Sequence, residues 1–377
     1  MPDAPTAPDL PLDELAEALA RGEPLALLDV READEFEAAH VPGARSLPLS
    51  QLESAASRDA LAPLAPLAPL ALVADLDPGA LVVTFCASGR RAARARDALS
   101  RLGLSGARAA ASGMLEWLAR GLPAAGAAIP HPDDARRYAR QLRLPEVGPR
   151  GQARLARARV AIVGVGGLGC PAALYLAAAG VGHLTLVDPD LVSLDNLHRQ
   201  VLFRTDDVGT PKVSAARAAL LARTPRLTVE GRALPLGREN AIALLGGHDL
   251  LVDATDNYAA RAEVNRASCE LEVPAVFGAV ARFEGQVTTR LPGRGPCYVC
   301  LHPSPPGDGM APTCAEEGVL GVVPGVIGLL QAHEALKVLL GYGDPLVGTL
   351  LHFDARTSRF RALGFDRAPG CAACGAA

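Results

Sequence analysis

The fold of this chain is decided by the stretch Val160-Ala161-Ile162-Val163-Gly164-Val165-Gly166-Gly167-Leu168-Gly169. Four apolar residues run into a glycine turn, and we expect a helix from about Cys170 to Ala179. Glycines permit the tight turn and a close backbone approach, and the unpaired N–H groups at the helix start attract a phosphate. The next apolar strand, Leu184–Val187, leads to Asp188, the position of an acidic residue that bonds a ribose hydroxyl. The stretch therefore predicts an α/β fold that binds a nucleotide.

Four polar residues further along the chain indicate which kind of nucleotide is bound. A dinucleotide cofactor is the usual ligand of this glycine pattern. However, Asn196, Arg199, Lys212 and Asp256 are better suited to a triphosphate and a metal ion. Lys212 and Lys337 are the only lysines among 37 basic residues. In a chain that otherwise uses arginine, a lysine is a candidate for a compact point charge on a phosphate.

Length and composition restrict the class of protein. A chain of 377 residues suggests two or three domains, and an apolar content of 49% is enough for sizeable cores. The net charge of −4 gives no reason to expect nucleic-acid binding. The first residues lack the features of a signal peptide, and the best apolar run, Gly318–Leu330, is short and interrupted by Pro324. We therefore expect a cytoplasmic protein with no membrane partner.

Eight cysteines include two Cys-x-x-Cys pairs. Without an export signal, metal or thiol chemistry is favoured over disulfides. Four thiolates form a closed tetrahedral zinc site, which is typical of a structural role, and redox cysteines are the alternative. Cys170 and Cys269 fall in predicted helices and are expected in the core, whereas Cys314 lies in a polar loop and is a functional candidate. The predicted zinc ligands are Cys297, Cys300, Cys371 and Cys374.

The first third of the chain alternates helical and strand patterns. Residues 1–8 are expected to be a tail, and the Leu-Ala-Pro repeats of residues 61–70 a surface spacer, because proline at every third position forbids a regular helix. The patterns predict helices at Pro11–Gly22, Arg31–His40 and Ala92–Arg101, and strands at Leu25–Val30 and Leu81–Phe85.

Cys86 lies between the end of a predicted strand and the start of a helix. The unpaired N–H groups of the helix and the neighbouring Arg90 and Arg91 favour its thiolate. A buried structural cysteine is the alternative. Residues 9–126 resemble a rhodanese domain, through Leu28-Asp29-Val30-Arg31, Glu35-Phe36, His40-Val41-Pro42-Gly43-Ala44, the Cys86–Arg91 loop and Gly113…Trp117…Gly121-Leu122-Pro123. The resemblance implies that Cys86 carries a persulfide sulfur, held by the backbone N–H groups of the loop Cys86, Ala87, Ser88, Gly89, Arg90 and Arg91.

After a proline-containing linker at residues 127–133, the rest of the chain predicts a mixed sheet. The segment Asp134–Arg143 has a helical pattern, and Pro324–Gly341 predicts a long apolar helix. The stripe of that helix, Val326, Leu329, Leu330, His333 and Leu336, is interpreted as core or dimer interface. Further strands are expected at Leu250–Asn257 and Ala275–Ala279, a helix at Ala259–Glu270, and antiparallel strands at Arg282–Arg290 and Leu350–Phe365.

Residues 134–377 resemble the MoeB/ThiF family of ubiquitin-activating-like adenylyltransferases. Besides Gly164–Gly169 and the two Cys-x-x-Cys pairs, the resemblance rests on Arg137-Tyr138-x-Arg140-Gln141, Leu144-Pro145-Glu146-Val147-Gly148, Asn196-Leu197-His198-Arg199-Gln200, Asp207-Val208-Gly209-x-Pro211-Lys212, Thr255-Asp256-Asn257, Glu284-Gly285-Gln286 and Thr313-Cys314. In eukaryotic and many bacterial fusions of this family the rhodanese domain follows the adenylating domain, whereas here it precedes it.

This resemblance implies a homodimer that uses ATP to activate the C-terminal glycine of a small ubiquitin-like sulfur carrier ending in Gly-Gly. Asp256 would hold Mg²⁺, Arg140 would reach into the site of the partner subunit, and the four cysteines would bind Zn²⁺. The implied ATP-binding residues are Gly164, Gly166, Gly167, Gly169, Asp188, Asn196, Arg199, Lys212, Asp256 and Asn257.

The sequence thus predicts a two-step enzyme of a sulfur pathway such as molybdopterin (molybdenum cofactor) or thiamin biosynthesis. The carrier is adenylated, and sulfur from a Cys86 persulfide, supplied by a donor such as a cysteine desulfurase, gives a thiocarboxylate. Cys314 would form a transient thioester or resolve the acyl disulfide. Three alternatives stay open: an adenylyltransferase whose rhodanese domain only docks or regulates, a Rossmann oxidoreductase using NAD or FAD, and a nucleotide-binding scaffold without turnover.

Overall fold

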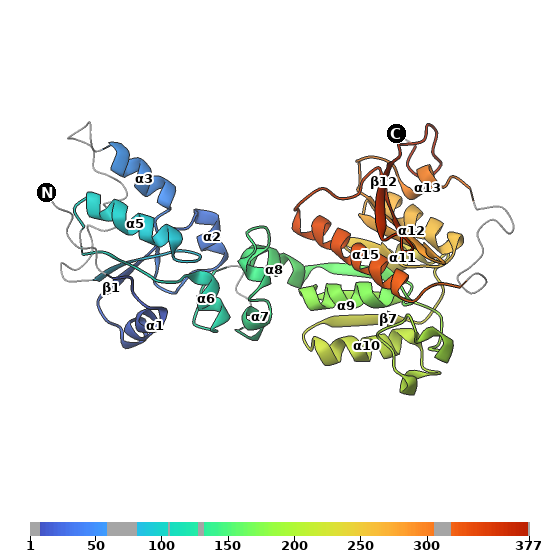
Figure 1. Cartoon of the computed structure of the whole chain (residues 1–377), viewed down its shortest axis with the longest axis horizontal. Helices are drawn as coiled ribbons and strands as arrows, with labels where there is room; N and C mark the ends of the chain where they lie inside the picture. Colours follow the sequence, from blue (N-terminus) through green and yellow to red (C-terminus); the bar gives the residue numbers. More distant parts are fainter. Residues whose placement is uncertain (1–7, 59–80, 105, 127–131, 305–317, 376–377) are drawn as a thin grey trace. The chain divides into compact units, whose positions relative to one another are not determined.

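The computed structural model of the chain describes residues 8–58, 81–104, 106–126, 132–304 and 318–375. The chain divides into two compact units, Met1–Ala153 (unit 1) and Arg154–Ala377 (unit 2) (Figure 1). The expected spacer at residues 61–70, nearly all of the expected tail, most of the expected linker and Cys314 lie outside the described residues. The domain limits drawn from the sequence stay a prediction.

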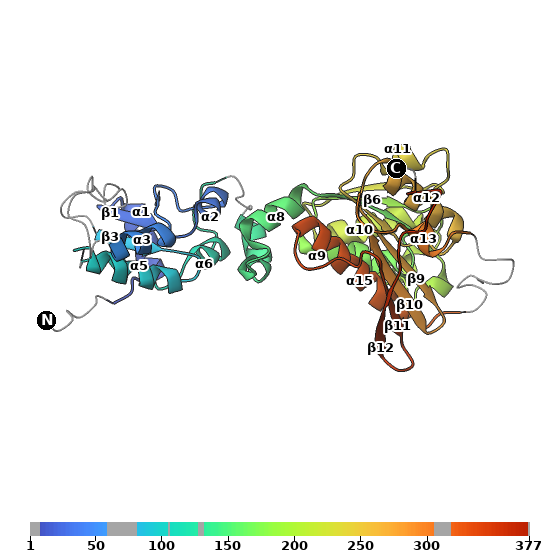
Figure 2. The ribbon, with the colours of Figure 1, turned by 90° about the horizontal axis from the view of Figure 1, so that it is seen from above.

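A parallel four-stranded sheet with the order β2-β1-β3-β4 forms the centre of unit 1 (Figure 2). Because successive residues of a strand point to opposite faces, Leu27 and Leu28 enter different apolar clusters, one on each face. The expected parallel sheet is confirmed. The elements of unit 1 are β1 (Leu25–Asp29), β2 (Arg45–Ser46), β3 (Leu81–Phe85), β4 (Arg108–Ala109), α1 (Leu12–Arg21), α2 (Ala33–Ala38), α3 (Leu49–Arg58), α5 (Arg90–Arg101), α6 (Met114–Ala119) and α7 (Pro132–Arg137).

The helix predicted over Asp134–Arg143 is wrong beyond Arg137, where α7 ends. The N–H of Ala139 bonds to the carbonyl of Arg136, three residues back, and a short 3₁₀ turn follows at Gln141–Arg143. Leu144 is extended, as expected for a residue that precedes proline. Helix α8 (Gly148–Arg157), which the sequence analysis missed, continues the chain from unit 1 into unit 2.

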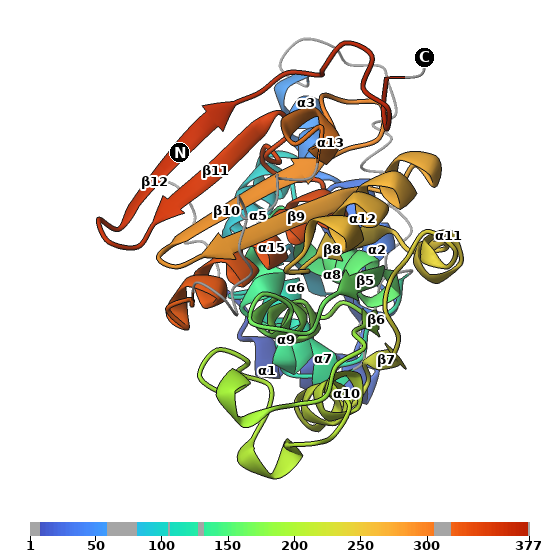
Figure 3. The same ribbon diagram turned by 90° about the vertical axis from the view of Figure 1, so that its right-hand side faces the viewer.

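Unit 2 contains an eight-stranded sheet with the order β12-β11-β10-β9-β8-β5-β6-β7 (Figure 3). Strands β5 to β9 are parallel, whereas β10, β11 and β12 join by antiparallel pairing. The expected mixed sheet is therefore confirmed. Its strands are β5 (Arg159–Val163), β6 (His183–Val187), β7 (Thr228–Arg232), β8 (Leu250–Asp253), β9 (Ala275–Ala281), β10 (Glu284–Arg290), β11 (Thr349–Asp354) and β12 (Arg359–Gly364).

Helices cover both faces of this sheet, and strand β5 lies where the two wings meet. The chain passes from β5 to β6 and β7 on one side and returns to β8 on the other, so the carboxyl ends of β5 and β8 meet at the point where ligands bind in such sheets. Helix α9 packs on α15 and α10, and α12 packs on α11, β8 and β9. The helices are α9 (Gly169–Ala179), α10 (Lys212–Arg223), α11 (Ala241–Leu245), α12 (Tyr258–Glu270), α13 (Tyr298–Leu301) and α15 (Val322–Leu340).

Helix α15 corrects one expectation from the sequence. With 19 residues it is long and apolar enough to cross a membrane by length and composition, although no such run was expected. Pro324 does not interrupt it, because that proline lies in the first turn, where a missing N–H costs no helical bond. Half of the helix is buried, and it packs against α9, β9 and β10. Gln331 Nε2 donates to the Asp253 carbonyl at 2.5 Å, which makes α15 a core helix of unit 2.

A buried ion pair fixes the backbone where β8 ends. Arg261 Nε lies 2.6 Å from Asp253 Oδ2, and its Nη2 donates to the carbonyls of Thr255 (2.7 Å) and Gly278 (2.8 Å). Asp253 is fully buried, which raises the pKa of its carboxyl, and the charge of Arg261 opposes that shift. Arg261 therefore ties α12 to the carboxyl end of β8 and to the middle of the neighbouring strand β9.

Replacing Arg261 with methionine should lower the free energy of unfolding by about 3–5 kcal/mol, because an uncompensated buried carboxylate is left behind. Arg266→Met is a matched control on the same helix. Arg266 pairs with Glu263 and Glu270 near the surface, so its loss should cost at most about 1 kcal/mol. Urea denaturation followed by circular dichroism measures both, and equal losses would contradict the structural role given to Arg261.

Candidate functional site

The glycine turn after β5 lies directly against the end of β8. Gly164 has φ +90°, and a Cβ there would be 2.5 Å from the Ala254 carbonyl oxygen. A Cβ on Gly169 would be 1.9 Å from the Gly164 carbonyl oxygen. Only glycine fits either position, since both contacts are with rigid backbone. The turn is thus held at the carboxyl edge of the sheet.

Asp188 and Lys212 meet beside this turn. Asp188 follows β6, accepts the N–H of Val165 at 2.7 Å and lies 3.9 Å from Lys212 Nζ. Both side chains are nearly inaccessible, and burial raises the pKa of Asp188 while the lysine charge opposes the shift. Lys212 Nζ also donates to Asp190 Oδ2 at 2.7 Å. A buried cation is therefore positioned at the start of α10, next to the glycine turn.

Arg199 also lies close to the glycine turn. A Cβ on Gly167 would lie 3.4 Å from Arg199 Cδ and 3.0 Å from Pro324 Cβ of α15. Arg199 Nη2 is 3.4 Å from Asn196 Oδ1, and Gln200 Nε2 donates to the same oxygen at 2.6 Å. The structure therefore brings the predicted residues Asn196 and Arg199 to the glycine turn.

Three other predicted site residues, Asp256, Asn257 and Arg140, have surroundings unlike those of Lys212 and Arg199. Asp256 lies two residues after Ala254 and is exposed, and its Oδ1 accepts a long hydrogen bond of 3.4 Å from Asn257 Nδ2. Asn257 caps α12, because its Oδ1 accepts the N–H of Ala260 at 2.9 Å. Arg140 belongs to unit 1, where it is exposed. The structure thus gives Asn257 a structural contact that the sequence analysis did not foresee.

Two residues at this site escaped the sequence analysis. Asp190 holds Lys212, and the spacing Asp188-x-Asp190 at the end of a strand was a usable signal. Gln200 is 2% exposed, and its Oε1 is a buried acceptor with no hydrogen-bond partner among the described residues. A Cβ on Gly166 would lie 3.7 Å from Gln200 Nε2. Gln200 therefore lies beside the glycine turn and holds the side chain of Asn196.

Unit 1 contains a second site, around Cys86. The Sγ of Cys86 accepts the N–H groups of Gly89 (3.2 Å) and Ala92 (3.3 Å) at the start of α5. Gly89 has φ +90°, and a Cβ there would lie 2.9 Å from the Ala111 carbonyl oxygen. The loop therefore needs glycine at this point, and its backbone donors face the sulfur, as they would a sulfur anion.

The Cys86 loop is clamped from two directions. Arg91 forms a two-pronged ion pair with Glu35 of α2, with both N–O distances at 2.7 Å. The N–H of Met114, at the start of α6, donates to the Cys86 carbonyl at 2.8 Å. A Cβ on Gly113 would lie 2.1 Å from that carbonyl oxygen. Helices α2 and α6 thus fix the geometry of the loop.

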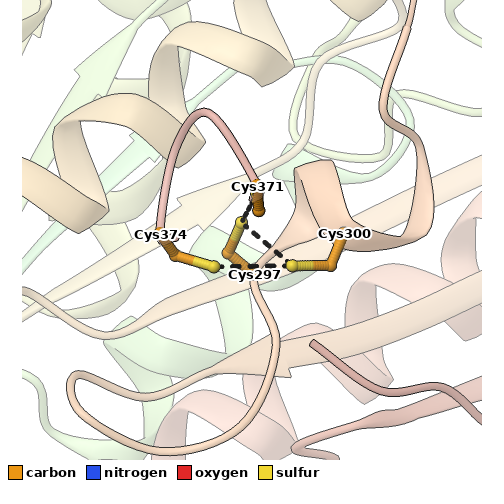
Figure 4. A group of neighbouring side chains, drawn as sticks. All are labelled: Cys297, Cys300, Cys371 and Cys374. Atoms are coloured by element: carbon orange, nitrogen blue, oxygen red, sulfur yellow. Dashed lines mark hydrogen bonds between the residues drawn. The ribbon is translucent and has the colours of Figure 1, made fainter. Parts of the chain in front are cut away.

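The four cysteines of the Cys-x-x-Cys pairs converge in unit 2 (Figure 4). Their sulfurs lie within 4.8 Å of one another, with separations of 3.9 Å (Cys297–Cys300), 3.7 Å (Cys297–Cys371) and 3.4 Å (Cys300–Cys374). A tetrahedral metal with bonds of about 2.3 Å places its sulfurs roughly 3.8 Å apart. The cluster therefore fits a metal ion. Cys269, expected in the core, is instead half-buried.

Residues 138–373 match the ThiF family, and residues 11–120 match the rhodanese-like domain. Because the first match covers more than half of the chain, this protein belongs to the ThiF family and carries an N-terminal rhodanese-like domain. Both resemblances drawn from the sequence are confirmed.

Three relatives are similar over the second part of the chain. The sulfur carrier protein adenylyltransferase of Thermus thermophilus is 52% identical over 244 residues, which are 63% of this chain and 90% of that protein. The SAMP-activating enzyme E1 of Haloferax volcanii is 47% identical, over 63% of this chain and 88% of that protein. The adenylyltransferase and sulfurtransferase MOCS3 of Anopheles gambiae is 45% identical, over 64% of this chain and 55% of that protein.

Solved structures have the same fold over a similar region. Escherichia coli MccB, in a structure with succinimide, is 25% identical with a TM-score of 0.55, and covers 63% of this chain and 74% of its own. PaaA is 27% identical with a TM-score of 0.54, and covers 63% of this chain and 75% of its own.

Proposed function

We propose that this enzyme adenylates the C-terminal glycine of a small ubiquitin-like sulfur carrier ending in Gly-Gly, and then transfers sulfur to it from a Cys86 persulfide. The observation that carries the proposal is the presence of two sites on one chain. One is a glycine turn flanked by Lys212 and Arg199, and the other is a cysteine whose sulfur faces two backbone N–H groups. The names of the relatives agree with both activities.

In the first step, the carrier carboxylate attacks the α-phosphate of ATP and pyrophosphate leaves. Lys212 and Arg199 offset the charge repulsion between the two anions, and Asp188 binds the ribose. Gly167 lies against the nucleotide, and Asn196 contacts a phosphate. No general base is needed, because a terminal carboxylate is ionised at neutral pH. An exposed carboxylate such as Asp256 suits Mg²⁺, which is bound through one or two carboxylates plus substrate phosphates and offsets their charge.

In the second step, the outer sulfur of the Cys86 persulfide attacks the acyl carbon and AMP leaves. The product is an acyl disulfide between the carrier and Cys86. A thiol then cleaves the sulfur–sulfur bond and releases the carrier thiocarboxylate, while the attacking thiol forms a disulfide with Cys86. We propose Cys314 for this role or for a transient thioester. The loop donors at Gly89 and Ala92 face the sulfur of Cys86 and hold the persulfide that attacks the acyl carbon.

Several further assignments complete the proposal. The enzyme acts as a cytoplasmic homodimer, and a cysteine desulfurase or similar donor loads Cys86 for molybdopterin, thiamin or related sulfur chemistry. The exposed apolar face of α15, with Val322 (61% exposed) and Leu329 (38%), supports a dimer interface. Arg140 would act at the nucleotide site of the partner subunit.

We assign Zn²⁺ to the four-cysteine cluster, where it would have a structural role. Cys371→Ser should lose the bound metal and lower the thermal midpoint, because the site joins two pairs that are separated by 70 residues of chain, 301–370. Inductively coupled plasma mass spectrometry measures the metal per chain. Cys269→Ala, which removes a neighbouring thiol outside the four, should keep one zinc. Full zinc content in Cys371→Ser would refute the assignment.

The proposed function is tested by ATP–pyrophosphate exchange with a purified Gly-Gly-ended carrier. Exchange should depend on the carrier and on Mg²⁺, and a carrier lacking its last glycine should give none. Absence of carrier-dependent exchange would refute the adenylation step. Bound flavin or nicotinamide, detected by absorbance, would favour an oxidoreductase instead, and ATP binding without turnover would favour a scaffold.

A further inference from the structure

One segment belongs to the ThiF family by sequence and to the rhodanese-like unit by its contacts. The family match begins at residue 138, but unit 1 extends to Ala153. We call residues 132–153 the arm, of which residues 138–153 lie within the family match. It comprises α7, the 3₁₀ turn and the first part of α8, and it carries Arg140. Arg140 therefore belongs to unit 1, although it is proposed above to act in adenylation, which is the chemistry of unit 2.

Apolar packing joins the arm to α6. Ala135 is 1% exposed and belongs to the same buried cluster as Trp117 and Leu118 of α6, and α7 contacts α6 directly (Figure 1). Hydrogen bonds from Ser112 and Arg120 lower the pKa of Glu116 in α6, and the charge of Arg143 in the arm adds to this effect. The arm therefore has both an apolar and an electrostatic contact with this helix.

Ion pairs join the arm to α2. Arg150 Nη1 is 3.0 Å from Asp34 Oδ2, and its Nη2 is 4.0 Å from Glu37 Oε2. These groups are half exposed or more, so the pairs contribute little to global stability. They can nevertheless fix where the arm lies, because opposite charges set the register of a contact at little energetic cost.

The two helices that hold the arm are the same two that hold the Cys86 loop. Helix α2 binds Arg91 of the loop through Glu35, and α6 binds the loop carbonyls of Cys86 and Ala87 through the N–H groups of its first residues. Each helix thus contacts the Cys86 loop through some of its residues and the arm through others. The arm therefore packs against the same two helices that hold the Cys86 loop.

We propose that the rhodanese-like unit positions the arm, and with it Arg140, for adenylation, with Arg150, Asp34 and Ala135 as positioning residues. The inference rests on the proposed function of Arg140. It gives the rhodanese-like unit a second task, which does not depend on the sulfur of Cys86.

Arg150→Glu should lower the kcat/KM of carrier-dependent ATP–pyrophosphate exchange by roughly fivefold, since it replaces two attractions by repulsions of about 1 kcal/mol in total. The double variant Asp34→Arg/Arg150→Glu restores an opposite pair and should return exchange to within about twofold of wild type. Arg157→Glu, an exposed arginine of the same helix that lies in unit 2, is the matched control and should leave exchange unchanged. Thiosulfate:cyanide sulfurtransfer by Cys86 should be equal in all four proteins.

Two further measurements separate positioning from a general defect. In an Arg140→Ala background, Arg150→Glu should cause no additional loss, because it acts through Arg140. Hydrogen exchange of the peptide covering residues 132–143 should be faster in Arg150→Glu than in wild type, and normal in the charge-swapped pair. Unchanged hydrogen exchange, or additive losses with Arg140→Ala, would overturn the inference. If wild type lacks carrier-dependent exchange, the proposed function fails, while hydrogen exchange still tests the docking of the arm.

Discussion

Replacing Lys212 with alanine should lower the kcat of carrier-dependent ATP–pyrophosphate exchange by roughly 100- to 1,000-fold, the usual cost of removing one group that stabilises developing charge. Lys212 is buried beside the glycine turn and Asp188, so its charge acts in a medium of low dielectric. Steady-state kinetics with varied ATP would separate kcat from KM.

Two companion variants show whether the loss reflects catalysis. Lys212→Arg keeps the charge but not the compact ammonium, and should recover only part of the rate. Asp190→Asn removes the exposed partner of Lys212 and should alter the rate far less, because the lysine remains. Thermal unfolding of each variant reports whether the loss of charge compensation at Asp188 has destabilised the fold. A folded Lys212→Ala enzyme with full exchange activity would exclude the role proposed for this residue.

Cys86→Ala should abolish thiocarboxylate formation and leave carrier adenylation intact. The alanine lacks the sulfur that faces the Gly89 and Ala92 N–H groups, so no persulfide can form at this position. Mass spectrometry of the carrier detects the product, because exchange of the terminal oxygen for sulfur adds about 16 Da. ATP–pyrophosphate exchange on the same preparation is the internal control, and its rate should equal that of wild type.

The opposite pattern would be equally informative. Full thiocarboxylate output from Cys86→Ala would assign sulfur delivery to another thiol and leave unit 1 as a docking or regulatory module. Glu35→Gln offers a graded comparison, since it weakens the clamp on Arg91 without touching the sulfur. Sulfur transfer in this variant should fall between that of wild type and that of Cys86→Ala.

Local patterns predicted much of the fold. The apolar run ending at Val163 and the strand at Leu81–Phe85 occur where expected, because a continuous apolar segment before a glycine turn leaves few alternatives to a buried strand. The sequence also predicted a site around Gly167, since strand ends of a parallel sheet meet at one edge, and this site stays a prediction. The residues Asn196, Arg199 and Lys212 do lie by this turn, while their roles stay predictions.

Other features depend on contacts distant in sequence. Strand β7, with Glu230 and Gly231, lacks a continuous apolar pattern and is defined by its pairing with β6. The end of α7 at Arg137 was missed, because residues beyond it retain a helical pattern. Ala135 of the arm belongs to the same buried cluster as Trp117 of α6, and no local signal in the sequence reports such a contact.

Strand β12 ends the sheet of unit 2, and among the described strands it pairs only with β11. Its outer side therefore offers free backbone groups, a surface on which two copies could join by strand addition into aggregates. Arg359 and Arg361 lie on this strand, beside the exposed Phe360 and Leu363. Two such strands would bring like charges together, and their repulsion opposes the pairing of two copies along β12. At about 1 M salt the screening length shortens to about 3 Å, so the colloidal stability of the protein should decrease.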